Sequence, residues 1–228
     1  MSARTGVVVA IDGPSGSGKS STSRGVASRL GLRYLDTGAM YRAMTWWMIR
    51  HHVPIDDPAA IATRCGEPVI VAGTDPHNPT ITVDGQDVAA AIRTPEVTGA
   101  VSPVSAVPQV RARLLVLQRE TIADATRGAG IVVEGRDIGA VVAPDADVKL
   151  YLTADAAARA ARRAAEEGGS DLAATESSLL ARDRIDSTRT ASPLTMAEGA
   201  VHIDTTPYSL DEVIGLVVAL VEAVEAPA

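Results

Sequence analysis

The stretch Gly13-Pro14-Ser15-Gly16-Ser17-Gly18-Lys19-Ser20-Ser21 fits the phosphate-loop pattern G-x-x-x-x-G-K-[ST]. It follows the apolar run of residues 7–11, which predicts a buried parallel strand, and it leads into residues 20–30, which predict a helix. A plain Gly/Ser-rich turn is the alternative, but the glycines suit backbone N–H groups that turn toward an anion at a helix N-terminus. The stretch therefore predicts a bound nucleoside triphosphate, with Lys19 at its β- and γ-phosphates and Ser20 as a Mg²⁺ ligand.

The composition narrows the class of protein. The 228 residues are enough for one α/β domain with inserted parts, and the net charge of -7, without a basic block, argues against a nucleic-acid partner. The single cysteine, Cys65, excludes an internal disulfide and a cysteine-based zinc site, which favours a reducing compartment. No signal-peptide pattern and no apolar run of about 18 residues is found, so we expect a cytoplasmic protein with no membrane partner.

Four further apolar runs predict the remaining strands of the sheet. They cover residues 32–36, 131–134, 148–152 and 200–204, and helical segments separate them. This alternation predicts a P-loop three-layer α/β fold: a five-stranded parallel sheet with helices on both faces. Ligands of such sheets lie at the carboxyl ends of the strands. The polar residues Asp36 and Thr37, and the run Glu134-Gly135-Arg136-Asp137, stand at those ends with the phosphate loop.

An insertion interrupts the alternation of strands and helices. Residues 69–72 and 80–85 predict an antiparallel hairpin, within an inserted part of about residues 66–90. Residues 95–108 are small and polar, and no element is assigned to them. Residues 110–127 then predict a long helix.

Arginines supply the positive charge that phosphoryl transfer needs around its phosphate groups. Arg42 and Arg136 stand near predicted strand ends, and a helix face that could close as a lid carries Arg159, Arg162 and Arg163. The alternative for this face is a solvated surface balanced by Glu166 and Glu167. A second stripe, at positions i, i+4 and i+7, carries Arg182, Asp186 and Arg189, and on spacing alone it is also consistent with plain helix stabilisation.

Several of these pieces together resemble the bacterial-type cytidylate kinases, in the nucleoside monophosphate kinase family, over nearly the whole chain. EGRDIG and the downstream RDRIDSTR are the specific pieces, whereas the phosphate loop is generic. The resemblance implies a single kinase domain spanning residues 1–228, with a monophosphate-binding insertion at about 37–108 and a mobile lid at about 155–170. The matching stretches are IDGPSGSGKSS (11–21), LDTGAMYR (35–42), IRTPEV (92–97), VPQVR (107–111), EGRDIGAVVAPDADVKLYL (134–152), ARAARR (158–163) and RDRIDSTRTASPL (182–194).

The resemblance also implies the activity and the roles of individual residues. It implies transfer of the γ-phosphoryl group of ATP, with Mg²⁺, to CMP or dCMP. The implied acceptor site has Arg42 and Arg136 at the phosphate; it has Thr37, Arg111, Asp137 and Arg189 at the base, and Ser102, Arg182 and Asp186 at the ribose. Lys19, Arg136, Arg159, Arg162 and Arg163 are the expected catalytic residues. Thr37 stands where many members of the family have Ser, so a hydroxyl is kept and a methyl group is added.

Two other functions remain to be weighed. A P-loop kinase of a small non-nucleotide metabolite, such as a sugar acid, would explain the loop and the lid but not the set of residues at the base and ribose. A GTP-dependent switch would need an N-K-x-D guanine motif, and Lys19 and Lys149 are the only lysines in the chain. The sequence does not determine the oligomeric state, and we expect a monomer.

Overall fold

A computed structural model describes residues 6–166, 171–188 and 194–225. Its centre is the predicted five-stranded parallel sheet, with strands in the order β2-β6-β1-β7-β8. The strands are β1 (Val7–Asp12), β2 (Arg33–Asp36), β6 (Gly130–Gly135), β7 (Val148–Thr153) and β8 (Val201–Asp204). The five apolar runs of the sequence predicted these strands to within one or two residues at each end.

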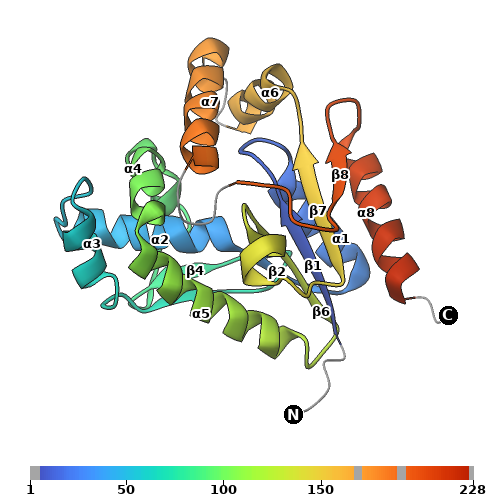
Figure 1. Cartoon of the computed structure of the whole chain (residues 1–228), viewed down its shortest axis with the longest axis horizontal. Coiled ribbons are helices and arrows are strands. Elements are labelled where there is room, and N and C mark those ends of the chain that lie inside the picture. The colour runs from blue at the N-terminus through green and yellow to red at the C-terminus, as the bar shows by residue number, and fades with distance from the viewer. Residues whose placement is uncertain (1–5, 167–170, 189–193, 226–228) are drawn as a thin grey trace.

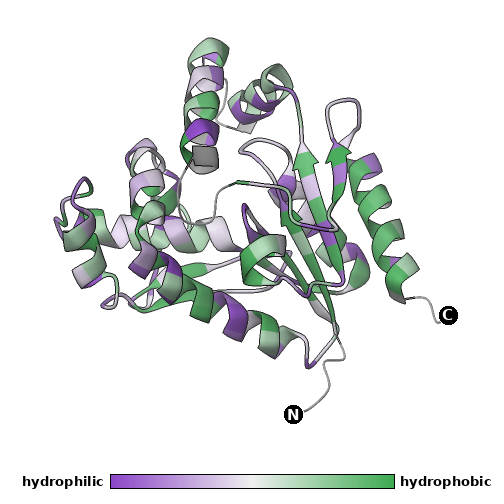
Figure 2. Cartoon of the chain, in the orientation of Figure 1, coloured by the Kyte–Doolittle hydropathy of each residue, from purple (hydrophilic) through white to green (hydrophobic). Residues whose placement is uncertain are grey.

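Helices cover both faces of this sheet (Figure 1). On one face lie α1 (Lys19–Leu30) and α8 (Leu210–Glu225), and on the other lie α2 (Thr37–Arg50), α5 (Pro108–Ala125) and the short helix η2 (Ile138–Val142). The alternation along β1 explains the two layers, because Val8 and Ala10 pack on the α2 and α5 side while Val9 and Ile11 pack on the α1 and α8 side. Figure 2 shows the apolar central strands that result.

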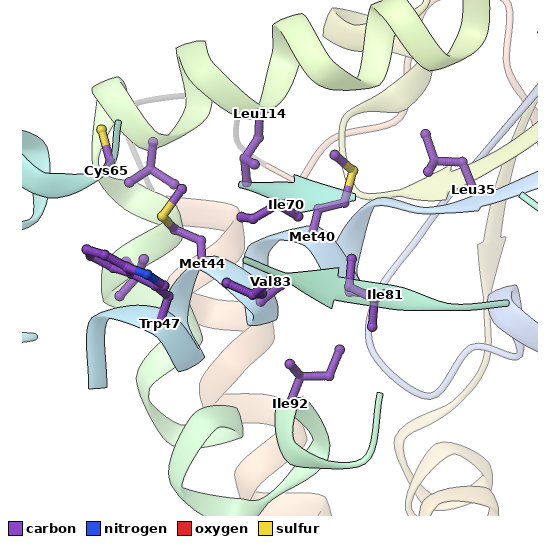
Figure 3. Packing of buried hydrophobic residues seen from close by; sticks show 14 of the residues in the cluster. Leu35, Met40, Met44, Trp47, Cys65, Ile70, Ile81, Val83, Ile92 and Leu114 are labelled. Atoms are coloured by element: carbon purple, nitrogen blue, oxygen red, sulfur yellow. The ribbon is translucent and has the colours of Figure 1, made fainter. Parts of the chain in front are cut away.

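The insertion between the second and third strands of this sheet is larger than the predicted hairpin. After α3 (Pro58–Arg64), the strands β3 (Ile70–Ala72), β4 (Ile81–Val83) and β5 (Gln86–Asp87) form a three-stranded antiparallel sheet. Its apolar face packs against α2: Figure 3 shows Ile70, Ile81 and Val83 beside Met40 and Met44. This contact fixes the small sheet to the main body of the protein.

The small and polar residues 95–108, which carried no assigned element, fold in large part as a helix. After the short helix η1 (Ala91–Arg93), α4 (Pro95–Ala106) begins with Pro95 and is capped by Thr94, whose side chain accepts a hydrogen bond from the Val97 amide at 3.5 Å. Val97, Val101 and Val104 are buried at helical spacing. The pattern was present in the sequence, but Pro103 and the small polar residues between the valines obscured it.

Two further helices follow β7. They are α6 (Ala156–Glu166), which contains the predicted lid arginines, and α7 (Leu172–Thr188), and they pack against each other. In Figure 1 they stand beyond the carboxyl ends of the strands, on the side where the phosphate loop lies. None of the described helices is long and apolar enough to cross a membrane.

Candidate functional site

The phosphate loop connects the buried strand β1 to helix α1, as the sequence predicted. Gly18 precedes the helix with a φ of 86°, in the left-handed region that favours glycine, and no side chain caps the helix. The first N–H groups of α1 are therefore free of a side-chain cap and suit an anion. Lys19 closes over the loop, since its Nζ donates to the Pro14 carbonyl at 2.7 Å.

A pocket of about 470 Å³ opens in front of this loop. Its wall brings together most of the predicted site residues from six separate parts of the chain. These are Ser15, Gly16, Gly18, Lys19, Ser20 and Ser21 of the loop; Thr37 and Arg42 of α2; Ser102 of α4; Arg111 of α5; Arg136 and Asp137 after β6; and Arg163 of α6. The remaining loop residues, Gly13, Pro14 and Ser17, complete the turn without lining the pocket.

Arg42 is the most informative of these residues. Its Nη1 atom is buried and has no hydrogen-bond partner among the described residues. Burial lowers the pKa of its guanidinium, and the nearby carboxylate of Asp36 opposes this shift. The guanidinium stays charged, because the pKa of arginine lies far above neutral pH. A buried cationic donor that lacks a partner is costly, so its place in a pocket wall indicates an anionic ligand.

The wall also holds a buried ion pair between Arg111 on α5 and Asp137 after β6. The guanidinium of Arg111 lies 5.4 Å from the ring centroid of Tyr41, in cation–π contact, and it donates to the Ser105 carbonyl at 3.3 Å. Both charged groups are thus held in one arrangement. Together they present a guanidinium and a carboxylate to the pocket, which suits a planar ligand edge with acceptors and a donor.

Glu134, the last residue but one of β6, lines the pocket and accepts hydrogen bonds from two hydroxyl groups. Ser20 Oγ donates to its Oε2 at 2.9 Å, and the buried Tyr34 hydroxyl donates to Oε1. Burial raises the pKa of the Glu134 carboxyl, and burial lowers the pKa of the nearby Lys19 ammonium, which the charge of Arg136 lowers further. The sequence placed Glu134 at a strand end but gave it no role.

The three arginines of α6 have different surroundings. Arg159 is buried, donates to the Ser15 carbonyl at 3.1 Å and forms an ion pair with Asp183 on α7. Arg162 donates to the hydroxyl and the carbonyl of Thr205, both at 2.8 Å. Arg163 lines the pocket.

Asp183 and Thr205 are site residues that sequence reasoning missed. Asp183 also lies 3.8 Å from Arg136, and Thr205 Oγ1 donates to the Ser17 carbonyl of the phosphate loop at 3.1 Å. No local pattern marks either residue, because their partners are distant in sequence. Of the predicted ribose and base residues, Arg189 and the side chains of Arg182 and Asp186 lie outside the described part of the structure.

Ser20 could contribute to a magnesium site. Mg²⁺ prefers oxygen ligands and is usually held by one or two protein groups together with water and substrate phosphates. The exposed hydroxyl of Ser20, fixed by Glu134, fits that donor set. Within the described residues there is no group of three His, Cys, Asp or Glu side chains that could hold a metal ion. An ion bound here would therefore depend on phosphates supplied by a ligand.

Comparison with known proteins adds independent evidence. The family model for cytidylate kinase matches residues 9–223. The cytidylate kinase of Streptomyces griseus is 60% identical over 220 residues, covering 96% of this chain and 94% of its own. That of Streptomyces coelicolor is 62% identical over 216 residues, covering 95% and 93%. Among solved structures, a gluconokinase from Sinorhizobium meliloti is 16% identical, with a TM-score of 0.50 over 98% of this chain and 96% of its own, which is a likeness of fold.

Proposed function

The chain belongs to the cytidylate kinase family, and we propose how its pocket carries out the reaction of that family. The reaction transfers the γ-phosphoryl group of ATP to CMP or dCMP, giving ADP and CDP or dCDP. The observation that carries the assignment to this pocket is the placement of Arg42. Arg42, whose buried Nη1 atom has no hydrogen-bond partner among the described residues, lines the same pocket as the phosphate loop, so the pocket offers one place for the donor phosphates and a second place for the acceptor phosphate.

The donor phosphates bind at the phosphate loop in this proposal. The N–H groups at the start of α1 and the ammonium of Lys19 hold the β- and γ-phosphates, and Lys19 exchanges its bond to the Pro14 carbonyl for a phosphate oxygen. Ser20, oriented by Glu134, is the protein ligand of Mg²⁺. When bound, Mg²⁺ would neutralise charge on the donor phosphates.

Arg42 and Arg136 hold the phosphate of the acceptor. A phosphate monoester has its second pKa near 6, so its attacking oxygen is largely ionised at neutral pH and the reaction requires no general base. The main barrier is to bring two anions together in line, which the cations of the pocket achieve by positioning and charge stabilisation. Arg163 supplies further positive charge to the transferring group, whereas Arg159 and Arg162 attach α6 to the phosphate loop and to Thr205.

Base and ribose recognition is assigned to the rest of the pocket wall. Asp137 accepts from the exocyclic amino group of cytosine, Arg111 donates to the ring acceptors, and Thr37 borders the base. We assign Ser102, Arg182 and Asp186 to the ribose and Arg189 to the base, as the family resemblance implies. We assign residues 37–108 to monophosphate binding and residues 155–170 to the lid, and we place the monomeric protein in the cytoplasm.

Substitution of Arg42 tests this arrangement. Arg42→Met should raise the KM for CMP by about 5- to 150-fold, the value of one buried polar contact, with little change in the KM for ATP. Arg50→Met is the matched control, because Arg50 lies two turns further along α2 and is exposed. An unchanged KM for CMP in Arg42→Met would remove the acceptor phosphate from this position.

A further inference from the structure

Asp12 is a buried carboxylate that the reaction described above does not use. It is the last residue of β1, immediately before the phosphate loop, and only 3% of its surface is exposed. Its Oδ1 accepts from the Ile138 amide and its Oδ2 from the Gly139 amide, both at 2.8 Å. Both oxygens therefore bind the first turn of η2, which is 126 residues further along the chain.

The turn that contains Arg136 and Asp137, which is proposed to bind the acceptor, connects β6 to the part of η2 that Asp12 holds. Asp12 pairs with Gly135 in the parallel register of β1 and β6, and Arg136 and Asp137 occupy the step from Gly135 to η2. On the other side, Thr37 Oγ1 donates to the Glu134 carbonyl at 2.7 Å. The turn is thus anchored at both ends, and the anchor at its far end is Asp12.

We infer that Asp12 is a positioning residue for the acceptor site: it holds the turn of Arg136 and Asp137 at a fixed place relative to the phosphate loop. This inference rests on the proposed roles of Arg136 and Asp137. Asp12 itself is not expected to touch either nucleotide, because both of its oxygens are occupied by backbone amides. Because Asp12 ends the strand from which the phosphate loop starts, its hydrogen bonds to η2 fix the distance between the donor and acceptor sites.

The effect of losing Asp12 should be unequal for the two substrates. Hydrogen bonds to an ionised acceptor are stronger than neutral ones, and their loss would leave the buried amides of Ile138 and Gly139 without partners. The phosphate loop has other supports, namely its glycines, the Lys19 contact with Pro14 and the Thr205 contact with Ser17. The turn that holds the acceptor should shift while the donor loop keeps its shape.

The test is a comparison of binding by calorimetry. Asp12→Asn keeps the size of the side chain but turns an NH₂ group toward one of the two amides. The dissociation constant of CMP should rise about tenfold, and that of ATP should change by less than about twofold. The matched control is Asp147→Asn. Asp147 Oδ2 accepts from the Val8 amide at 2.7 Å at the opposite end of the same strand, so this variant should lower the melting temperature without changing either constant.

Asp12→Glu provides a second variant that retains the charge near Lys19 but lengthens the side chain, and it should show the same unequal effect. An equal loss of affinity for CMP and ATP, or an unchanged dissociation constant for CMP, would overturn the inference. If Asp12→Asn does not fold, Asp12→Glu decides by the same criterion. A wild-type protein that phosphorylates neither CMP nor dCMP would instead contradict the proposed function, so the two failures are distinct.

Discussion

The guanidinium of Arg111 donates to the carboxylate of Asp137, and this buried ion pair joins α5 to the turn after β6. The two groups proposed to read the base therefore hold each other in one relative orientation. Such preorganisation reduces the ordering cost of binding. It also means that a change to either residue alters the other.

Replacement of Asp137 should narrow the preference for cytosine. Asp137→Asn replaces a carboxylate, which accepts from the cytosine amino group and repels the uracil oxygen, with an amide that can donate. We expect kcat/KM to fall about 5- to 150-fold for CMP and dCMP alike, and to fall less for UMP. Asp145→Asn, in the exposed loop before β7, is the control. An unchanged ratio of CMP to UMP would place base recognition elsewhere.

Replacement of Lys19 should abolish transfer and leave the fold intact. Lys19→Ala removes the charge aimed at the transferring phosphoryl group, and we expect kcat to fall on the order of 10²-fold or more. Lys149→Ala is the control, because Lys149 is the only other lysine of the chain and its Nζ contacts the Glu198 carbonyl at 3.4 Å. Turnover of Lys19→Ala close to that of the wild type would refute the assignment of the phosphate loop.

The arginines of α6 should separate into two kinds. Arg163→Ala removes a cation from the pocket, so it should lower kcat more than it raises the KM for CMP. Arg162→Ala removes two hydrogen bonds to Thr205, so it should lower the melting temperature in addition to kcat. Measurements of kcat and thermal unfolding on both variants distinguish the roles. Wild-type kcat in Arg163→Ala would make this residue part of a solvated surface.

The stability of the protein should depend on pH through Asp12. Burial raises the pKa of Asp12 from 3.8 to about 6, against the hydrogen bonds from the Ile138 and Gly139 amides. Among the groups that face it, Asp137 raises this pKa further and Lys19 lowers it, while Tyr151 on β7 is a neutral neighbour with a raised pKa. Between about pH 4 and pH 6 the folded chain therefore holds a proton that the unfolded chain releases, and the free energy of unfolding falls as pH rises.

Asp12→Asn removes this titration. The stability of the wild type relative to Asp12→Asn should be greatest near pH 4, decrease toward about pH 6.5 and then remain level. Urea unfolding of both proteins across this range measures the difference. A difference that is constant or increases with pH would contradict the raised pKa.

The sequence predicted the sheet and the phosphate loop because both depend on local patterns. Residues 7–11 are apolar and β-branched, and the loop that follows them has fixed spacing. Helix α4 escaped assignment because Pro103 and small residues obscured its buried valines. The two-residue strand β5 was too short to give a pattern of its own, and it exists because β4 pairs with it.

For the candidate site, the sequence predicted only residues that stand in recognisable motifs. Several motif residues singled out in the sequence line the pocket, including Arg42 and Asp137, but Glu134, in the same motif as Asp137, also lines it and was given no role. The residues that support them were not predicted, because the contacts of Asp12 with Ile138 and of Thr205 with Ser17 join positions more than one hundred residues apart. The different surroundings of Arg159, Arg162 and Arg163 likewise depend on what α6 packs against, which helical spacing does not show.

In the proposed function, one pocket joins an ATP site to a site for cytidine or deoxycytidine monophosphate. The most direct measurement is coupled ADP release by the purified protein with ATP, Mg²⁺ and each of CMP, dCMP, UMP and AMP. We predict the highest kcat/KM for CMP and dCMP, a lower value for UMP and the lowest for AMP. ADP release that is independent of the nucleoside monophosphate, or that is fastest with AMP or UMP, would contradict the account.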